Sequence, residues 1–195
     1  EKATGWRGIG ILPWFAPARF LPAEDILDIA GKAGEANAAA PIHIAVPVLR
    51  RIANFDDLDP LAGESDVRLT LVEAGDPIPG DCDLVLLPGS KSTISDLAFL
   101  REQGWDIDIA AHLRRGGRVM GLCGGYQMLG RRVDDPHGIE GSKGATEGLG
   151  HLDVETMLAA EKTLTEVVAT SIACGANVSV YEIHMGQTSG DDCGR

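Results

Sequence analysis

Short apolar runs separated by turn residues fill the middle of the chain. The runs at residues 43–49, 67–72 and 84–87 are rich in aliphatic and β-branched side chains and are bounded by charged residues, Gly or Pro. Such runs are typical of strands that are buried on both faces of a sheet. Pro47 argues against a central position for the first of these strands, because proline cannot donate a ladder hydrogen bond.

Helical patterns alternate with these strands. The Thr-x-x-Asp spacing from Thr93 predicts a helix start, and residues 105–115 predict a second helix that ends in two arginines and a Gly-Gly stop. A buried strand at 117–122 leads into a helical turn at 126–131. The alternation predicts an α/β fold, with a mostly parallel sheet, helices on both faces and ligands at the carboxyl ends of the strands.

The two ends of the chain have weaker patterns. Residues 22–25 predict a helix start with acids in the first turn, and the Ala- and Gly-rich residues 30–40 predict a linker. Three later segments are predicted to be strands at turn-separated intervals, and these are 152–157, 165–172 and 177–183.

A cysteine enclosed by glycines stands at the junction of the strand and the helical turn. Residues 121–125 read Gly-Leu-Cys-Gly-Gly, the pattern of a nucleophile elbow that exposes the Cys123 side chain at the carboxyl end of a sheet. The N–H groups of a helix N-terminus favour a thiolate there, and the N–H of Gly124 is one donor for an oxyanion. The alternative is a buried structural cysteine in a Gly-rich turn.

Composition and charge narrow the classes of function. The 195 residues are 44% hydrophobic, enough for a substantial core, and no segment is long and apolar enough to span a membrane. A net charge of −12, with scattered Lys and Arg, argues against a nucleic-acid surface. The four cysteines show no Cys-x-x-Cys pair and no adjacent His cluster, so we expect no zinc site and a reducing cytoplasm.

Several longer motifs occur in a fixed order along nearly the whole chain. They lie at residues 8–14, 21–25, 54–61, 87–93, 123–130, 138–141 and 181–188. In that order they resemble the glutamine amidotransferase domain of the cobyric acid synthase family, a class I, flavodoxin-like amidotransferase fold. Cobyrinic acid a,c-diamide synthase and the lipid II amidating subunit share the elbow, and a non-catalytic or redox-sensing cysteine domain is a further alternative. The Pro-Trp, Pro-Ala-Glu-Asp and Asn-Phe-Asp-Asp segments favour the cobyric acid enzyme.

The resemblance implies a domain organisation. Residues 1–40 correspond to the end of a preceding ATP-dependent synthetase domain plus a linker, and residues 41–195 to an amidotransferase domain that is truncated at its C-terminus. The chain starts at Glu1 without a methionine. The family's catalytic histidine belongs to a later Gly-Thr-Tyr-Leu-His-Gly motif, which does not occur before Arg195.

The resemblance also implies roles for individual residues. Cys123 attacks the side-chain amide of L-glutamine, and the loop at 87–93 supplies a second oxyanion donor from Gly89 or Ser90, opposite Gly124. An ordinary turn with Ser and Thr capping is the alternative for this loop. The loop is not a Walker A sequence, because the spacing of its Gly and Lys is wrong. Ammonia then passes to the synthetase domain, which holds ATP and magnesium and amidates a corrinoid; this chain itself needs no cofactor or metal.

Pocket residues and the general base are less defined. Tyr126 and Gln127 follow the nucleophile and are candidates for the glutamine pocket, although helix packing explains them nearly as well. Among the histidines, His43 and His112 are predicted to be structural or surface residues, and His137 and His151 lie in Gly-rich connections that no motif selects. His184 falls in a matched motif, and we expect a supporting or pocket role for it rather than the base.

Overall fold

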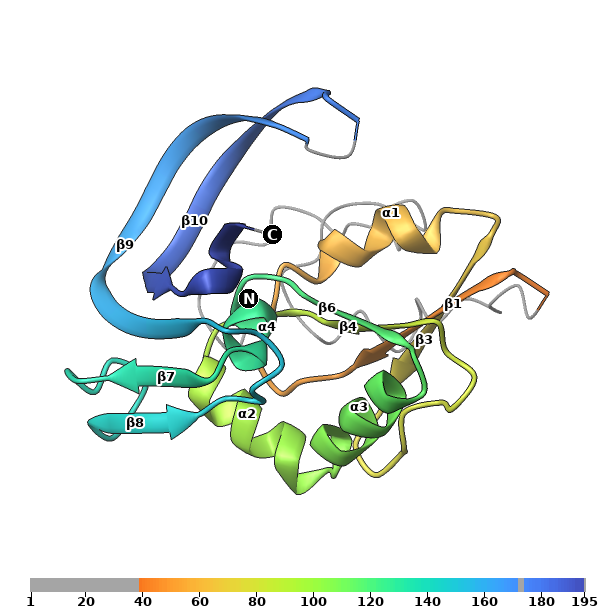
Figure 1. Cartoon of the computed structure of the whole chain (residues 1–195), viewed down its shortest axis with the longest axis horizontal. Helices are drawn as coiled ribbons and strands as arrows, with labels where there is room; N and C mark the ends of the chain where they lie inside the picture. Colours follow the sequence, from red (N-terminus) through yellow and green to blue (C-terminus); the bar gives the residue numbers. More distant parts are fainter. Residues whose placement is uncertain (1–38, 172–173, 195) are drawn as a thin grey trace, which may run out of the picture.

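The computed structural model describes residues 39–171 and 174–194, and its core is a four-stranded parallel sheet (Figure 1). The strands are β1 (Ile42–Pro47), β3 (Val67–Val72), β4 (Leu84–Leu87) and β6 (Arg118–Gly121), and they lie in the order β3-β1-β4-β6. Numbered along the chain, this order is 2-1-3-4, which matches the first four strands of flavodoxin-like sheets. The predicted α/β class is therefore confirmed.

Helices flank this sheet on both sides. In Figure 1, α2 (Thr93–Glu102) and α3 (Trp105–Arg114) lie below the sheet, and the short α1 (Asp59–Ala62) lies above it after the 3-10 turn η3 (Phe55–Leu58). The six-residue α4 (Gly124–Leu129) follows β6 in the sequence after Leu122 and Cys123. None of the described helices combines the length and the apolarity that crossing a membrane requires.

The core lies between the parallel sheet and α2 and α3. Val85, Leu86 and Leu87 of β4 are almost completely buried, as expected for a strand covered on both faces. Trp105 is fully buried, its ring meets Phe99 edge-on at a centroid distance of 5.7 Å, and its indole N–H donates to a backbone carbonyl. Full burial of one such side chain stabilises the fold by about 1.5–3 kcal/mol.

A second sheet follows the elbow. It contains β7 (Arg132–Asp135), β8 (Gly144–Glu147), β9 (Glu155–Thr170) and β10 (Asn177–Ser189) in the order β10-β9-β7-β8, and only β7 and β9 are parallel. Most of the segments predicted at 152–157 and 165–172 is strand, but their separation is wrong, because one continuous strand, β9, runs from Glu155 to Thr170. The strand predicted at 177–183 is the first part of β10. Its hairpin with β10 projects from the body as a ribbon (Figure 1).

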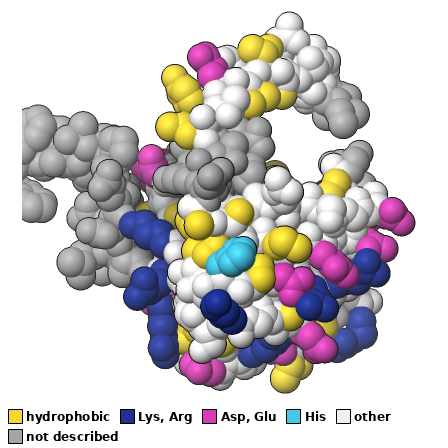
Figure 2. All heavy atoms as spheres, turned by 90° about the vertical axis from the view of Figure 1, so that its left-hand side faces the viewer, with side chains coloured by type: hydrophobic (Ala, Val, Ile, Leu, Met, Phe, Trp, Pro, Cys, Tyr) yellow, Lys and Arg dark blue, Asp and Glu magenta, His cyan; other side chains and the backbone are white. Residues whose placement is uncertain are grey.

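The outer part of this ribbon exposes apolar side chains. Leu164, Val168 and Tyr181 are 66%, 75% and 70% exposed. Cross-strand register puts the three residues on one face, since Leu164 pairs with Ile183 and Tyr181 with Glu166. Figure 2 shows hydrophobic side chains along the projecting arm at the top of the molecule.

The expectation that Pro47 disfavours a central strand is wrong. β1 lies between β3 and β4, with Pro47 as its last residue. The N–H of Val48 donates to Val72 of β3, so strand alternation turns the Pro47 nitrogen toward β4. Pairing with β4 ends at Ala45, and the missing donor therefore costs no ladder hydrogen bond.

The helix start at Thr93 is confirmed, but the side chains of Thr93 and Asp96 do not cap α2. Thr93 Oγ1 donates to Gln127, and the Asp96 carboxylate accepts from Ser90, so neither side chain caps a backbone N–H at the start of α2. The helix predicted at 105–115 is also confirmed, with Gly116 in the left-handed conformation that ends many helices. The helix start at 22–25 and residues 30–38 of the linker lie outside the described residues.

Candidate active site

Cys123 occupies a tight turn between β6 and α4. Its backbone has φ 46° and ψ −108°, an unusual conformation for a residue with a side chain, and its side chain is exposed. Hydrogen bonds on both sides fix the turn: Leu122 N–H donates to Leu87 at 2.9 Å, and Gly125 N–H donates to Leu122 at 2.8 Å. A conformation of this kind costs about 1–3 kcal/mol and is found mainly at functional sites. Cys123 is therefore not the buried structural cysteine that the alternative interpretation required.

The glycines around Cys123 are required by close contacts. A Cβ atom on Gly121 would lie 2.5 Å from the backbone nitrogen of Tyr126, and one on Gly125 would lie 2.3 Å from the carbonyl oxygen of Leu87. Both distances are far shorter than van der Waals contact, so α4 approaches the ends of β4 and β6 only where side chains are absent. This explains the Gly-x-Cys-x-Gly pattern by sterics.

Gly124 of the elbow and Ser90 of β5 lie in close contact. Gly124 is the first residue of α4, so its N–H has no acceptor within the helix. It also lies against Ser90, because a Cβ on Gly124 would be 2.9 Å from the Ser90 nitrogen. The two residues bring the β5 loop and the elbow together as an oxyanion hole requires.

The backbone N–H groups of Gly89 and Ser90 point to opposite sides of their strand. Both residues form β5 (Gly89–Ser90), which pairs antiparallel with β2 (Ile52–Ala53). Lys91 N–H donates to the Arg51 carbonyl, which makes Ser90 the member of a non-hydrogen-bonded pair and turns its N–H away from β2. Gly89 pairs with Ala53, so its N–H faces β2. Ser90 is therefore the better-oriented candidate.

Gln127 and Tyr126 both make hydrogen bonds to other parts of the chain. Gln127 is 8% exposed; its Oε1 accepts from Thr93 Oγ1 at 3.0 Å, and its Nε2 donates to the Met185 carbonyl at 3.4 Å. Gln127 thereby links α2, α4 and β10. The Tyr126 hydroxyl lies 3.9 Å from Cys193 Sγ, in the 3-10 turn η4 (Asp191–Gly194) after β10. Burial and the adjacent Cys193 raise the pKa of Tyr126.

His43 and His112 are structural, as predicted. His43 is 4% exposed, and its Nε2 lies 2.9 Å from Thr70 Oγ1 on the neighbouring strand β3. His112 is 2% exposed; its Nε2 lies 3.0 Å from the Arg118 carbonyl, and its Nδ1 lies 3.6 Å from Cys82 Sγ. Burial raises the pKa of that Cys82 thiol. Both rings contribute to packing within the sheet and α3.

His137 and His184 belong to the second sheet and its connections, not to the parallel sheet that carries the elbow. His137 is exposed in the connection between β7 and β8. His184 pairs with Thr163 in the β9–β10 ladder, and its side chain is not among those described. No described side chain forms a hydrogen bond with the Cys123 thiol.

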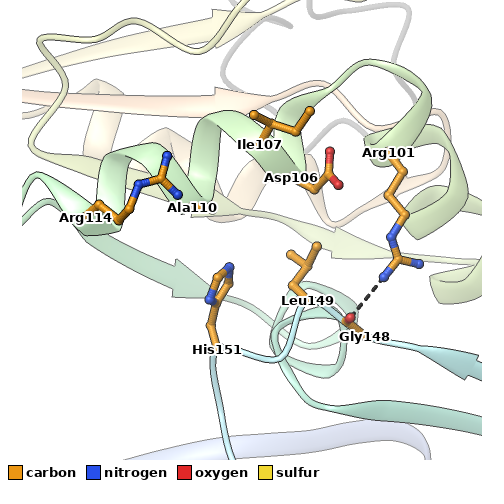
Figure 3. A pocket seen from close by; sticks show the side chains of 8 residues that line it. All are labelled: Arg101, Asp106, Ile107, Ala110, Arg114, Gly148, Leu149 and His151. Atoms are coloured by element: carbon orange, nitrogen blue, oxygen red, sulfur yellow. Dashed lines mark hydrogen bonds between the residues drawn. The ribbon is translucent and has the colours of Figure 1, made fainter.

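His151 lines a separate cavity of about 370 Å³ between α2, α3 and the connection that precedes β9 (Figure 3). Arg101 and Arg114 also line it, and burial lowers the pKa of His151. Leu149, which also lines the cavity, is attached to the end of α4, because its N–H donates to the Met128 carbonyl. Since Cys123 is not part of its lining, this cavity is not the glutamine site of the elbow.

Sequence reasoning missed the carboxylates that hold the loops around the elbow. Asp135 is fully buried, and its oxygens accept from the N–H groups of Ile139 and Glu140 at 2.8 and 2.9 Å. Burial acts to raise the pKa of Asp135, but these N–H groups outweigh it and lower the pKa on balance. Glu140 in turn accepts from the N–H of Ile94, at the start of α2. The signal for Glu140 was the Gly-Ile-Glu-Gly motif at residues 138–141, and Asp135 comes shortly before that motif in the sequence.

Comparison with known sequences identifies the family. Residues 43–194 match the CobB/CobQ-like glutamine amidotransferase domain. The chain is 59% identical over 194 residues to a cobyric acid synthase of Paracoccus denitrificans (strain Pd 1222), covering 100% of this chain and 39% of that protein. It is 62% identical over 192 residues to one of Rhodobacter capsulatus, covering 98% and 39% respectively. The chain thus spans about two fifths of the length of these relatives.

Solved structures agree on the fold. The structure of PurLQS from Thermotoga maritima superposes with a TM-score of 0.57 at 19% identity, covering 78% of this chain and 71% of that one. A crystal structure of a glutamine amidotransferase gives 0.52 at 15% identity, covering 76% and 73%. Together with the elbow and the family match over residues 43–194, they lead to one conclusion. The chain belongs to the CobB/CobQ-like glutamine amidotransferase family.

Proposed function

We propose that this chain is the part of a cobyric acid synthase that releases ammonia from L-glutamine. The exposed thiol of Cys123 in its strained turn, with Gly124 packed against Ser90 next to it, is the observation that carries the proposal. The identities of 59% and 62% to cobyric acid synthases favour that enzyme over other members of the family.

The chemistry is an acyl transfer through a thioester. The Cys123 sulfur forms a bond to the amide carbon of glutamine, and the carbonyl oxygen takes up the negative charge. The N–H groups of Gly124 and Ser90 stabilise that oxyanion. The amide nitrogen leaves as ammonia after it gains a proton, and water then cleaves the thioester to give glutamate and the free thiol.

The general base is proposed to come from residues other than the described ones. Within the described sheet, β6 is an edge strand, and the fifth position of a flavodoxin-like order lies beside it. A strand in that position would end next to Cys123, at the carboxyl edge where ligands bind. His184 is kept for a supporting or pocket role, as is Tyr126.

The ammonia is proposed to pass to a synthetase domain that uses ATP and magnesium to amidate peripheral carboxylates of a corrinoid. Two observations support a nucleotide site outside this chain. The loop before α2 lacks the Walker A spacing, and the Glu140 carboxylate occupies the start of α2, where a phosphate would need to bind. The absence of cystine among Cys82, Cys123, Cys174 and Cys193 supports a reducing cytoplasm.

Covalent labelling tests the proposal. The glutamine-mimicking diazoketone 6-diazo-5-oxonorleucine should add to Cys123 in the full-length protein, and peptide mass spectrometry locates the adduct. Excess glutamine should slow the labelling, whereas excess asparagine, which is one methylene shorter, should not. Labelling of Cys174 or Cys193 at the same rate would contradict a glutamine site at the elbow, because both thiols are exposed.

A further inference from the structure

The strand that carries Ser90 has little backbone support. β5 contains two residues, and its ladder with β2 has two residue pairs. Isolated short ladders are marginal on their own, because few hydrogen bonds offset the cost of ordering the chain. Other contacts must therefore fix the direction of the Ser90 N–H.

Asp96 supplies such a contact from the first turn of α2. It is 1% exposed, and a single oxygen, Oδ2, accepts from Ser90 Oγ at 2.7 Å and from the N–H of Arg51 at 3.2 Å. Ser90 Oγ also accepts from the N–H of Ser92 at 3.0 Å. One carboxylate oxygen thus joins the residue before β2, the end of β5 and the start of α2.

The burial of Asp96 is unfavourable in itself. Burial raises the pKa of its carboxyl above the ordinary value, and the hydrogen bonds from Ser90 and Arg51 offset only part of that rise. A buried carboxylate is retained where its hydrogen bonds hold specific groups in place. Here the carboxylate holds the loop that contains Ser90. That loop packs closely against Gly124, because a Cβ atom added to Gly124 would lie 3.0 Å from the Ser90 Cβ.

We propose that Asp96 is a positioning residue that holds the Ser90 backbone N–H at the oxyanion, acting through the Ser90 hydroxyl. This inference rests on the proposed function, since it assigns a part to the same thioester chemistry. The side-chain hydrogen bonds of Asp96 go to Ser90 and Arg51, and none goes to the Cys123 thiol. An oxyanion donor acts mainly in the transition state, so a displaced donor lowers kcat and leaves KM nearly unchanged.

Two substitutions at Asp96 separate positioning from charge. Asp96→Ala removes the acceptor for both Ser90 and Arg51. Asp96→Asn removes the buried charge, but its amide oxygen can take the place of Oδ2 and accept both hydrogen bonds. Asp108→Ala is the matched control, because Asp108 also accepts a backbone N–H, that of Ile78 at 3.0 Å, from a helix remote from the elbow.

Three measurements on the full-length protein are needed for each variant. Glutamate release gives kcat and KM for glutamine. Alkylation of Cys123 by iodoacetamide reports thiol access and reactivity without any oxyanion. Thermal unfolding reports general damage. Loss of one oxyanion donor costs about 100-fold to 1,000-fold in kcat, and a misdirected donor costs less, so we expect about 10-fold to 100-fold for Asp96→Ala.

The expected pattern is specific. Asp96→Ala lowers kcat with KM and the alkylation rate nearly unchanged, Asp96→Asn restores most of kcat, and Asp108→Ala has wild-type kcat. If Asp96→Ala fails to fold, Ser90→Ala gives the same kcat loss, since it deletes the hydroxyl that transmits the effect. Where both fold, the double variant is no worse than either single variant.

Opposite results overturn the inference. An unchanged kcat in Asp96→Ala or Ser90→Ala, or an equal fall in kcat and alkylation, would show that Asp96 does not act on the oxyanion hole. Failure of the proposed function looks different: Cys123→Ser would then leave glutamate release intact. If Cys123→Ser abolishes release and Asp96→Ala does not lower it, only the role of Asp96 is refuted.

Discussion

Gly125 has the least room for a side chain among the elbow glycines, so Gly125→Ala is a sharp test of the elbow geometry. The added Cβ would lie 2.3 Å from the Leu87 carbonyl oxygen and 2.8 Å from the Pro88 carbonyl oxygen. Both neighbours are backbone atoms, Leu87 at the end of β4 and Pro88 directly after it, and no rotamer change relieves the contact. Gly125 does not have a positive φ, so the effect is steric alone.

The size of the effect follows from these distances. Real Cβ atoms almost never approach another heavy atom closer than 3.0 Å, so α4 and β4 must separate by at least 0.7 Å, the difference between 3.0 and 2.3 Å. Overpacking of this kind costs about 1–3 kcal/mol of the free energy of unfolding. A displacement near 1 Å at a reacting group costs about 100-fold in rate. We therefore expect Gly125→Ala to lower glutaminase kcat/KM by about 10-fold to 100-fold.

Glutamate release and urea unfolding of the full-length protein measure the two effects. Gly80→Ala is the matched control, because a Cβ there meets no atom within 4 Å and the residue has no positive φ. Its activity and stability should equal those of the wild type. Wild-type kcat/KM in Gly125→Ala would refute the argument that the close approach of α4 to β4 sets the position of the nucleophile.

Two further predictions concern stability and association. Asp135→Asn should lower the free energy of unfolding at neutral pH. Because folding lowers the pKa of the Asp135 carboxyl below its ordinary value of 3.8, the ionised carboxylate stabilises the fold above pH 3.8, and this stabilisation is lost as the pH falls further and the group is protonated. The deficit of the variant should therefore narrow below pH 3.8, and a pH-independent deficit in urea titrations would contradict this. Leu164→Lys with Val168→Lys should reduce self-association in sedimentation experiments without lowering Tm, because both side chains are exposed on one ribbon face. Thr165→Lys, on the opposite face, is the control, and a fall in Tm for the double variant alone would show that the face is packed within the chain.

The elbow and the parallel sheet could be predicted because their signals are local. The pattern around Cys123 reflects contacts between Gly121, Gly125 and backbone atoms nearby, and β4 is a buried, near-continuous apolar run. Both follow from sterics and burial within a few residues. The expectation of burial on both faces is wrong for β3 and β6, because they are the edge strands of the sheet and are mostly half-buried or exposed.

The rest depends on pairing between distant residues. β2 and β5 have two residues each, too few for any periodicity, and β8 is mostly exposed and therefore lacks an apolar pattern. The spacing of Thr93 and Asp96 predicted the helix start but not the contacts, because tertiary partners, Gln127 and Ser90, take up both side chains. Such partners cannot be read from one segment alone.

The central claim is that Cys123 releases ammonia from glutamine for a separate amidation reaction. Its most direct test is Cys123→Ser in the full-length protein, with ATP-dependent amidation of the corrinoid measured once with glutamine and once with ammonium as the nitrogen source. The account predicts loss of glutamine-driven amidation and wild-type amidation with ammonium. Equal loss with both nitrogen sources would assign Cys123 a structural role, and full activity with glutamine would contradict the account.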